Sequence, residues 1–483
     1  MNPLLQKAYT PQYFREHGHA LIDLLADYLE AVETRQEETA IPYQTPEAAL
    51  DFWQKDLEEP LADDPTALFQ AVLNRSTRLH HPRTMGHQVP PPAPVAALAG
   101  LVSNVLNNGM AVYEMGMVAN PMERVVTDLL AKRLGFGENA NGLLTSGGTL
   151  ANLTAMLAAR AAKAPTAVWT EGASGDLAIM VSDEAHYCID RAARIMGLGN
   201  KGIIKVPTDD AFKMRVDLLE TYYHKAQLEG LTVIAIVGSC CSTSTGSHDD
   251  LLAIADFAES HNLWFHADGA HGGAAVFSKK YKPILRGIER ADSVVIDFHK
   301  MLLTPALATA LIFKRGEDSF HTFQQKAQYL WANTQEDWYN SGKRTFECTK
   351  FMIALKIYTL LRLYGEAIFE ANVDTLYDLG KAFGEMIQAR PAFELALPPE
   401  CNIVCFRIKG ENEDTNWNLL NSTIRQKLIE KGRFYFVQTT LRESVYLRVS
   451  LMNPLTTPQD LTELLDTIEQ ESIVYHANNP VLV

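Results

Sequence analysis

The stretch "NLWFHADGAHGG", residues 262–273, decides how the rest of the chain can fold. A strongly apolar run ends in Asp268, and the small residues Gly269 and Ala270 follow it. An ionised carboxylate in apolar surroundings needs a partner, or its pKa rises. A strand-end carboxylate commonly caps a helix or pairs with a cation, but the small residues after Asp268 also suit a flat ligand lying against the backbone. Either the fold or a bound ligand therefore supplies the partner of Asp268.

Apolar runs of this kind recur through the middle of the chain. They are continuous rather than alternating, and helix-like stretches such as residues 249–261 separate them. The other runs are "LAIMVSD" (177–183), "LTVIAIVGS" (231–239), "DSVVIDFHK" (292–300) and "ATALIFK" (308–314). Strands that are apolar on both faces are typical of a mostly parallel sheet covered by helices on both sides. The sequence therefore predicts an α/β fold for the main body.

The pattern along the chain predicts three regions. Apolar residues recur at helical spacing after Thr10-Pro11, which is typical of a helix start, and proline clusters interrupt the chain up to about residue 95. We expect residues 1–95 to form an N-terminal helical arm that wraps a partner subunit, because its helices have little of their own to pack on. Residues 96–373 then form the large domain, and residues 374–483 form a small α+β domain.

Composition limits the possible partners. The chain has 483 residues, of which 47% are hydrophobic and 21% are charged, as in an ordinary globular protein. The formal net charge of −15 disfavours nucleic acid and anionic membranes as partners. The N-terminus lacks the apolar stretch of a signal peptide, and no apolar run reaches membrane-spanning length. The six cysteines show neither a disulfide framework nor paired zinc spacing, so we expect a reducing cytoplasm and no metal site.

Two further stretches bring polar groups to the ends of predicted strands. In "LLTSGGTLANLTAMLAAR", residues 143–160, Ser146-Gly147-Gly148 open a helix whose free N–H groups suit a phosphate, although a tight turn gives the same pattern. In "DSVVIDFHKMLLTP", residues 292–305, a buried strand runs into His299-Lys300. Burial lowers the pKa of a lysine, which imine chemistry requires, whereas a lysine at a sheet edge would instead extend to solvent.

Ligands of open parallel sheets bind beyond the carboxyl ends of the strands, so these three stretches converge on one place. A phosphate cradle, an aspartate for a ring nitrogen and a desolvated lysine together predict pyridoxal 5'-phosphate as cofactor. Lys300 holds the aldehyde as an imine, and Asp268 keeps the pyridinium protonated so that the ring accepts electrons. The ring nitrogen is then the partner that Asp268 requires.

The chain resembles the group II pyridoxal-phosphate decarboxylases along nearly its whole length. That group includes the glutamate, cysteine sulfinate, aspartate, aromatic amino acid, histidine and diaminobutyrate decarboxylases. The matching motifs, in family order, are "HPRTMGHQ", "YE" at 113–114, "TSGGTLAN", "SDEAHYCIDRA", "STSTGSHDDL", "HADGAHGG", "DFHK" and "YLRVSLMNPLTTPQDL". The resemblance implies the fold-type-I architecture of aspartate aminotransferase, an amino acid as substrate, and an obligate homodimer with the site near the subunit interface.

The resemblance also assigns roles to single residues. The catalytic residues are Lys300 as the imine lysine, Asp268 as the pyridinium partner and His186, which stacks on one face of the ring opposite Ala270. Cofactor and phosphate contacts are expected from Ser146, Gly147, Gly148, Ser242, Thr243, Ser293 and His299. Arg448 aligns with an arginine that holds a substrate carboxylate, and Asn108 and Tyr113 are expected beside the substrate. Without the resemblance, a satisfied core residue is the better explanation of His186, and Arg448 is equally explained as a surface arginine on a strand.

Four positions depart from the family pattern. Gly269 and His271 stand where the family has an alanine and an aromatic residue, and Cys241 replaces a glycine. Asp297 replaces the asparagine that is common two residues before the histidine, which puts a like charge near the phosphate. The sequence "DFHK" is nevertheless seen in the diaminobutyrate-type branch.

The resemblance implies that CO2 leaves an L-amino acid and that a proton returns to Cα. In relatives a tyrosine on a mobile loop delivers this proton, and the matching segment, residues 325–344, offers Tyr329 and Tyr339 without deciding between them. The segment 107–116 and Arg448 favour an acidic substrate (glutamate, aspartate or cysteine sulfinate), whereas Asp297 favours L-2,4-diaminobutyrate, and an aromatic L-amino acid stays open. A fold-type-I aminotransferase, a desulfurase and a non-catalytic binding protein are more distant alternatives.

Overall fold

The computed structural model describes residues 1–60, 64–173, 175–323, 337–410 and 415–478. The chain divides into two compact units. Unit 1 comprises Met1–His87, Ala382–Ala396 and Val404–Val483, and unit 2 comprises Gln88–Lys381 and Leu397–Ile403.

Unit 2 is built on a seven-stranded sheet with the strand order β1-β7-β6-β5-β4-β2-β3. The strands are β1 (Asn141–Thr145), β2 (Leu177–Ser182), β3 (Ile203–Val206), β4 (Thr232–Ser239), β5 (Trp264–Asp268), β6 (Ser293–Asp297) and β7 (Thr309–Phe313). Neighbouring strands from β6 to β3 pair in parallel, and β7 is antiparallel to both of its neighbours. The predicted apolar runs are therefore confirmed as strands, and the mostly parallel α/β architecture is confirmed with them.

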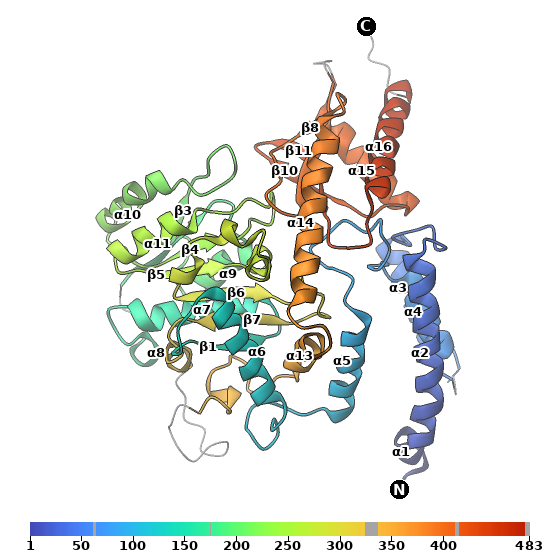
Figure 1. Ribbon diagram of the computed structural model, residues 1–483, viewed down its shortest axis with the longest axis horizontal. Coiled ribbons are helices and arrows are strands. Elements are labelled where there is room, and N and C mark those ends of the chain that lie inside the picture. The colour runs from blue at the N-terminus through green and yellow to red at the C-terminus, as the bar shows by residue number, and fades with distance from the viewer. Residues whose placement is uncertain (61–63, 174, 324–336, 411–414, 479–483) are drawn as a thin grey trace. The chain divides into compact units, whose positions relative to one another are not determined.

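Helices cover this sheet on both faces (Figure 1). On one face α7 (Gly148–Lys163) contacts α9 (Tyr187–Ile195), and their apolar residues pack in one cluster with Trp264 of β5. On the other face α11 (Leu251–Ser260) packs closely on β4, where a Cβ added at Gly238 would lie 2.8 Å from Leu251 Cδ2. Successive residues of a strand point to opposite faces, so the two-sided cover explains why the strands are apolar throughout.

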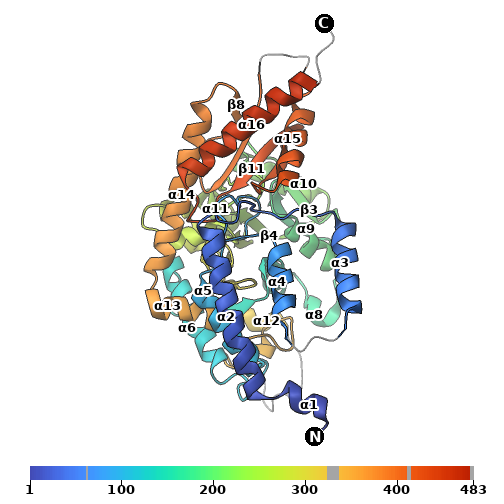
Figure 2. The ribbon, with the colours of Figure 1, turned by 90° about the vertical axis from the view of Figure 1, so that its right-hand side faces the viewer.

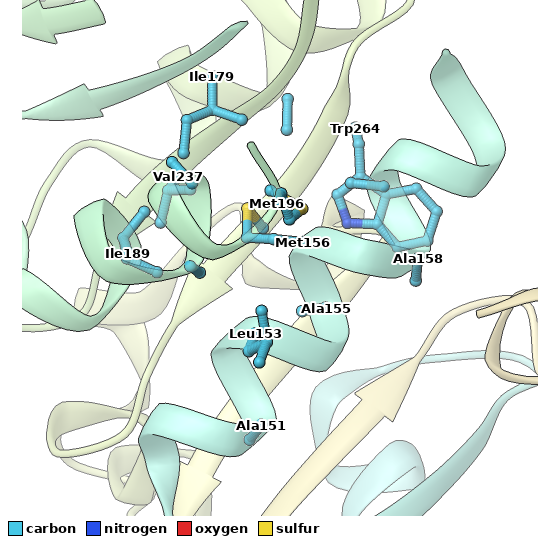
Figure 3. Packing of buried hydrophobic residues seen from close by; sticks show 14 of the residues in the cluster. Ala151, Leu153, Ala155, Met156, Ala158, Ile179, Ile189, Met196, Val237 and Trp264 are labelled. Carbon is cyan, nitrogen blue, oxygen red and sulfur yellow. The ribbon is translucent and has the colours of Figure 1, made fainter. Parts of the chain in front are cut away.

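The core on the α7 face is made of interlocking aliphatic and small residues around Trp264 (Figure 3). Met156 of α7 is fully buried there, as are Ile179 and Val237 of β2 and β4. Alanines on the inner side of α7, such as Ala151 and Ala155, let the helix approach the sheet closely. This close approach fixes the first turn of α7, which bears the Gly-Gly segment, beside the strand ends.

The remaining helices of unit 2 follow the sequence order. They are α5 (Pro94–Leu106), α6 (Ala119–Leu134), α8 (Val168–Glu171), α10 (Leu219–Leu228), α12 (Asp318–His321), α13 (Ile353–Tyr364) and α14 (Ala367–Gln388), with short 3-10 helices at Val216–Leu218, Gly272–Phe277, Lys282–Leu285, Ile288–Arg290 and Ser341–Lys343. The last residues of α14 belong to unit 1.

Unit 1 has a smaller sheet of four strands in the order β10-β11-β9-β8. Its strands are β8 (Phe393–Leu395), β9 (Ile403–Ile408), β10 (Val437–Leu441) and β11 (Ser444–Ser450), and its helices are α1 (Pro3–Ala8), α2 (Pro11–Glu33), α3 (Pro46–Glu58), α4 (Thr66–Arg75), α15 (Trp417–Lys431) and α16 (Pro458–Asn478). Helix α15 packs on β11 and against α16 (Figure 2). The helix predicted after Thr10 is confirmed as α2, with Pro11 in its first turn.

The N-terminal segment belongs to the same compact unit as the C-terminal strands, whereas the sequence pattern separated the two regions. Backbone hydrogen bonds connect them, because Met85 N donates to Tyr435 O and Ser450 N donates to Met85 O. A pattern of prolines marks where helices break, but it carries no information on such long-range pairing. The expectation that residues 1–95 wrap a partner subunit stays a prediction. Among the described residues, no helix combines the length and apolar character needed to span a bilayer.

Candidate active site

A cavity of about 430 Å³ lies at the carboxyl ends of the parallel strands of unit 2. The residues after β1, β4, β5 and β6 all contribute to its wall, as expected for a ligand site in an open parallel sheet. Its lining is Ser146, Gly147, Gly148, Thr149, Leu150, Asn152, Leu153, His186, Cys188, Ser239, Cys241, Thr243, Asp268, Ala270, His271, Asp297, His299, Lys300 and Leu307. The three stretches singled out in the sequence therefore meet in one place.

Asp268 is the last residue of β5, and it is buried with its carboxylate at the cavity. Its hydrogen bonds come from neutral donors: Asn152 Nδ2 donates to Oδ2 at 3.1 Å, and the backbone N–H of Ala270 donates to Oδ1 at 3.2 Å. These donors orient the carboxylate without cancelling its charge. The fold therefore orients the carboxylate of Asp268, and a cationic ring edge in the cavity would balance its charge.

A row of buried groups behind Asp268 holds Asn152 in place. His266 Nε2–H donates to Asn152 Oδ1 at 2.7 Å, while Ser293 Oγ lies 2.8 Å from His266 Nδ1 and accepts from Trp264 Nε1 at 2.9 Å. With its amide oxygen bound to His266, Asn152 presents its amide nitrogen to Asp268. Burial lowers the pKa of His266 to about 4, so the imidazole is neutral at pH 7. The row thus orients Asp268 through hydrogen bonds and adds no positive charge.

Lys300 directly follows His299 in the turn after β6, and its ammonium contacts Asp297 Oδ2 at 3.0 Å. Burial lowers the pKa of Lys300, but the carboxylates of Asp297 and Asp268 outweigh burial, so the pKa is raised. The sequence-based expectation of a depressed pKa is therefore wrong for the chain as described here. The physical reason is Asp297, whose position three residues before Lys300 places it within ion-pair distance.

The Gly147-Gly148 segment forms the helix entry that the sequence predicts. Gly147 is the N-cap of α7 with a φ of 136°, a conformation that L side chains rarely adopt. A Cβ at Gly148 would lie 3.3 Å from both carboxylate oxygens of Asp297, so glycine keeps the space between α7 and β6 open. Ser146 adds a hydroxyl that donates to Glu347 Oε1 at 3.0 Å. Gly147 and Gly148 both line the cavity, and the first N–H groups of a helix lack intrahelical partners, so this helix entry fits a phosphate site.

Four other predicted residues lie on the cavity wall: His186, Ala270, Thr243 and His299. His186 is the N-cap of α9, where its Nδ1 accepts from the N–H of Cys188 at 3.3 Å, and burial lowers its pKa. An uncharged imidazole with a fixed ring orientation suits stacking on an aromatic ligand. His299 Nδ1 lies 3.0 Å from Ala308 O, which ties the turn before Lys300 to the start of β7.

The other predicted residues lie elsewhere. Ser293 begins β6, at the end opposite to the cavity, and its hydroxyl is engaged by Trp264 and His266, so it does not contact a phosphate at Gly147-Gly148. Ser242 is buried beside Thr243 and hydrogen-bonds to Ser244. Neither Asn108 nor Tyr113 is among the lining residues that the structure describes. Arg448 is a buried residue of β11 in unit 1.

The two tyrosines of the predicted loop are in different situations. Tyr329 lies outside the described residues. Tyr339 is described, and its ring packs against that of Tyr113 with centroids 5.6 Å apart. The nearby carboxylate of Asp337 raises the pKa of Tyr339.

Two residues of this site carry a role that the sequence reasoning missed. Asn152 lies in the quoted "TSGGTLAN" motif, four residues after Gly148 and hence one helical turn further along the same face. That spacing could have indicated a polar contact at the cavity. The sequence pattern treats Asp297 as a charge near the phosphate and as a sign of the diaminobutyrate branch, whereas its spacing of three from Lys300 could have indicated an ion pair.

The residues present fit pyridoxal 5'-phosphate. A partly buried lysine, a carboxylate oriented by hydrogen bonds, the small Ala270, the imidazole of His186 and a glycine helix entry all border the same cavity. Among these groups Lys300 would hold the aldehyde carbon, Asp268 the ring nitrogen and Gly147-Gly148 the phosphate.

Comparison with known proteins places the chain in a family context. Residues 62–409 match the model of the pyridoxal-dependent decarboxylase conserved domain. The acidic amino acid decarboxylase GADL1 of Mus musculus is 28% identical over 454 residues, covering 90% of this chain and 82% of that protein. The L-2,4-diaminobutyrate decarboxylase of Acinetobacter baumannii is 26% identical over 491 residues, covering 95% and 96%.

Solved structures show the same fold. The crystal structure of Catharanthus roseus tryptophan decarboxylase in complex with L-tryptophan superposes with a TM-score of 0.85 at 22% identity, covering 96% of this chain and 98% of that chain. The names of these similar proteins thus include acidic, dibasic and aromatic amino acids as substrates.

Proposed function

This chain belongs to the pyridoxal-dependent decarboxylase family and is a pyridoxal-phosphate-dependent amino acid decarboxylase, and from that premise we propose that its substrate is an acidic L-amino acid: glutamate, aspartate or cysteine sulfinate. One observation carries the assignment of the site. Asp268 and Lys300, from different strand ends, border a single cavity with Gly147 and Gly148 at the helix entry.

The proposed division of labour follows from the geometry. Bound pyridoxal phosphate supplies an electron sink for the electron pair that CO2 leaves behind. Asp268 would keep a proton on the ring nitrogen, because among the described residues its side-chain hydrogen bonds come from the neutral donors Asn152 and Ala270. The N–H groups of Gly147 and Gly148 hold the phosphate, and His186 and Ala270 confine the two ring faces. Thr243 and His299 complete the wall.

Lys300 has two tasks in this proposal. It would hold the cofactor before substrate binds, and Asp297, whose Oδ2 lies 3.0 Å from Nζ in this structure, would stabilise a proton on the released amine. Return of a proton to the substrate Cα is assigned to Tyr329 or Tyr339. The experiment that separates these tyrosines is substitution of each by phenylalanine, with amine formation compared to CO2 release.

The preference for an acidic substrate rests on Arg448, whose planar guanidinium suits a carboxylate, with Asn108 and Tyr113 as further substrate contacts. Acidic amino acid decarboxylase GADL1 is among the relatives. A second candidate is L-2,4-diaminobutyrate, because the "DFHK" segment with Asp297 occurs here and a diaminobutyrate decarboxylase is also a relative. An aromatic L-amino acid is the third.

We also propose that the enzyme is a homodimer, in the cytoplasm. The apolar residues Leu98, Leu101, Val102, Val105 and Leu106 of α5 are exposed in the single chain. A stripe of this kind is typical of a surface that another protein chain covers. Sedimentation of the purified enzyme tests the dimer, and a monomer at micromolar concentration would contradict it.

A panel of L-amino acids tests the substrate. The holoenzyme is incubated with glutamate, aspartate, cysteine sulfinate, 2,4-diaminobutyrate, tryptophan and tyrosine, and CO2 and amine are both measured. We expect the largest kcat/KM for one of the three acidic substrates, and Arg448→Gln should raise KM for that substrate while a control, Arg442→Gln on the adjoining turn, should not. Turnover confined to diaminobutyrate or an aromatic substrate would overturn the proposal. Release of CO2 also distinguishes decarboxylation from transamination.

A further inference from the structure

Three soft metal-ligating side chains meet inside unit 2, although they come from three distant segments. Cys241 follows β4, His271 follows β5, and Cys401 precedes β9. Their ligand atoms all lie within 4.8 Å of one another, and all three residues are buried. None of the three has a task in the proposed chemistry.

The spacing of the two sulfurs fits a tetrahedral metal ion. Two Zn–S bonds of about 2.3 Å at a tetrahedral angle place the sulfurs about 3.8 Å apart. In this structure Cys241 Sγ and Cys401 Sγ are 3.7 Å apart. A disulfide bond of about 2.05 Å would instead require a large approach of the sulfurs and would leave the imidazole unused. The geometry therefore favours a metal ion over a disulfide bridge.

His271 is oriented as metal-ligating histidines usually are. Its Nε2 lies 2.8 Å from Asn402 Oδ1, which can only accept, so Nε2 carries the hydrogen and Nδ1 the lone pair. Donation of the second ring N–H to an oxygen is the usual support of a histidine ligand, because it fixes both tautomer and ring orientation. Asn402 is itself fully buried, next to Cys401 in the chain. Asn402, which supports the histidine ligand, and Cys401, which supplies the second sulfur, are therefore adjacent residues of one segment.

The cluster also touches the active site. Cys241 and His271 both line the cavity that contains Asp268 and Lys300, so the cavity gives access to the cluster. Three protein ligands leave one tetrahedral position of zinc open to a water molecule or another donor. A cation bound at this wall would add positive charge near the carboxylate of Asp268. That charge would weaken the attraction of Asp268 for a protonated ring nitrogen.

We propose that Cys241, His271 and Cys401 bind a thiophilic divalent cation, of which Zn²⁺ is the test ion, and that its binding inhibits the enzyme. The coordination step releases the two thiol protons to solvent as two sulfur–metal bonds form, and no oxidation is involved. Binding of the metal is independent of the proposed substrate, and only the inhibition rests on the proposed function.

The test uses reduced, metal-free holoenzyme and a chromogenic chelator that competes for Zn²⁺. We expect one tightly bound Zn²⁺ per chain and loss of decarboxylation as the site fills. Cys401→Ser should weaken Zn²⁺ binding at least about 100-fold, since even outer partners of metal ligands are worth 10–100-fold. Because Cys401 does not line the cavity, this variant should keep its metal-free activity. The matched control is Cys348→Ser, which removes an exposed thiol outside the cluster and should leave both Zn²⁺ binding and inhibition unchanged.

X-ray absorption of the Zn²⁺-loaded wild-type enzyme tests the site without any variant. Two sulfurs at about 2.3 Å and a nitrogen at about 2.0–2.1 Å are expected. Equal Zn²⁺ affinity of the wild type and Cys401→Ser, or a coordination shell without sulfur, would overturn the site. Tight Zn²⁺ binding without inhibition would overturn the regulatory part alone, and absence of decarboxylation in metal-free enzyme would be a failure of the proposed function instead.

Discussion

Two aspartates end neighbouring parallel strands and border the same cavity, yet their surroundings differ. Asp268 ends β5 and accepts hydrogen bonds from the neutral groups of Asn152 and Ala270. Asp297 ends β6, accepts from the hydroxyl of Thr309 and pairs with the ammonium of Lys300 at 3.0 Å. Both are buried.

This difference shows how one fold position can serve two purposes. The charge of Asp297 is balanced inside the protein, so it acts on Lys300. The charge of Asp268 is oriented but not balanced by its hydrogen-bond donors, so it is available to a cationic ligand edge. The identity of the partner, rather than the strand-end position, decides what each carboxylate does.

The largest effect is expected from Lys300, which both aspartates influence. Lys300→Ala should lower kcat by at least about 10⁴-fold, as for removal of a covalently acting group. The visible absorbance of the bound cofactor should disappear from its usual band. Lys279→Ala, at an exposed lysine, is the control and should behave like the wild type. Retained decarboxylation by Lys300→Ala would remove the basis of the site assignment.

The second effect compares the two carboxylates directly. Asp268→Asn should lower kcat by about 10²–10³-fold, the usual loss for one preorganised electrostatic group, because asparagine cannot keep the ring nitrogen protonated. Asp297→Asn, the matched change on the next strand, should lower kcat much less. Steady-state kinetics at saturating cofactor measure both. Equal losses in the two variants would contradict the different roles of the two aspartates.

The third effect concerns the neutral support behind Asp268. Burial lowers the pKa of His266 to about 4, whereas an unfolded chain has a histidine pKa of about 6.5. Between these values the unfolded state binds more protons, so the free energy of unfolding falls as the pH falls. We expect His266 to account for a loss of about 2 kcal/mol between pH 7 and pH 5.

Urea unfolding of the wild type and of His266→Gln at pH 7 and pH 5 measures this loss in the free energy of unfolding. The variant should lose stability less steeply on acidification, while His224→Gln, at an exposed histidine, should keep the wild-type slope. An unchanged slope in His266→Gln would show that the imidazole is not held neutral.

The smallest effect sharpens the role of Asp297. Its carboxylate raises the pKa of Lys300, so Asp297→Asn should increase the neutral amine fraction of apoenzyme at pH 7.5, about tenfold for each unit by which the pKa falls. The rate of pyridoxal phosphate binding by apoenzyme should rise accordingly, and Asp292→Asn, at the residue before the same strand, is the control. A slower rate in Asp297→Asn would indicate that Asp297 assists binding in another way.

Much of the site could be predicted because it depends on local patterns. Asp268, Gly147-Gly148 and Lys300 each follow a continuous apolar run, and parallel strands bring their carboxyl ends to one edge. Ser293 is expected from the resemblance alone and lies elsewhere, since four residue steps of about 3.3 Å each separate it from Asp297 at the other end of the strand. The pKa of Lys300 was predicted from burial alone, and the sign was wrong because the distance to Asp297 decides it.

The sequence by itself determined the strands, the sheet edge at which the ligand binds and the chemical groups delivered there. These features depend on residue periodicity and strand direction, which can be inferred from the order of the residues. Only the tertiary structure decided that Cys241, His271 and Cys401 meet, since no spacing along the chain relates them and the predicted absence of a metal site rested on spacing. It also decided that Asn152 and His266 support Asp268, because a hydrogen bond depends on the distance and direction between atoms that folding alone brings together.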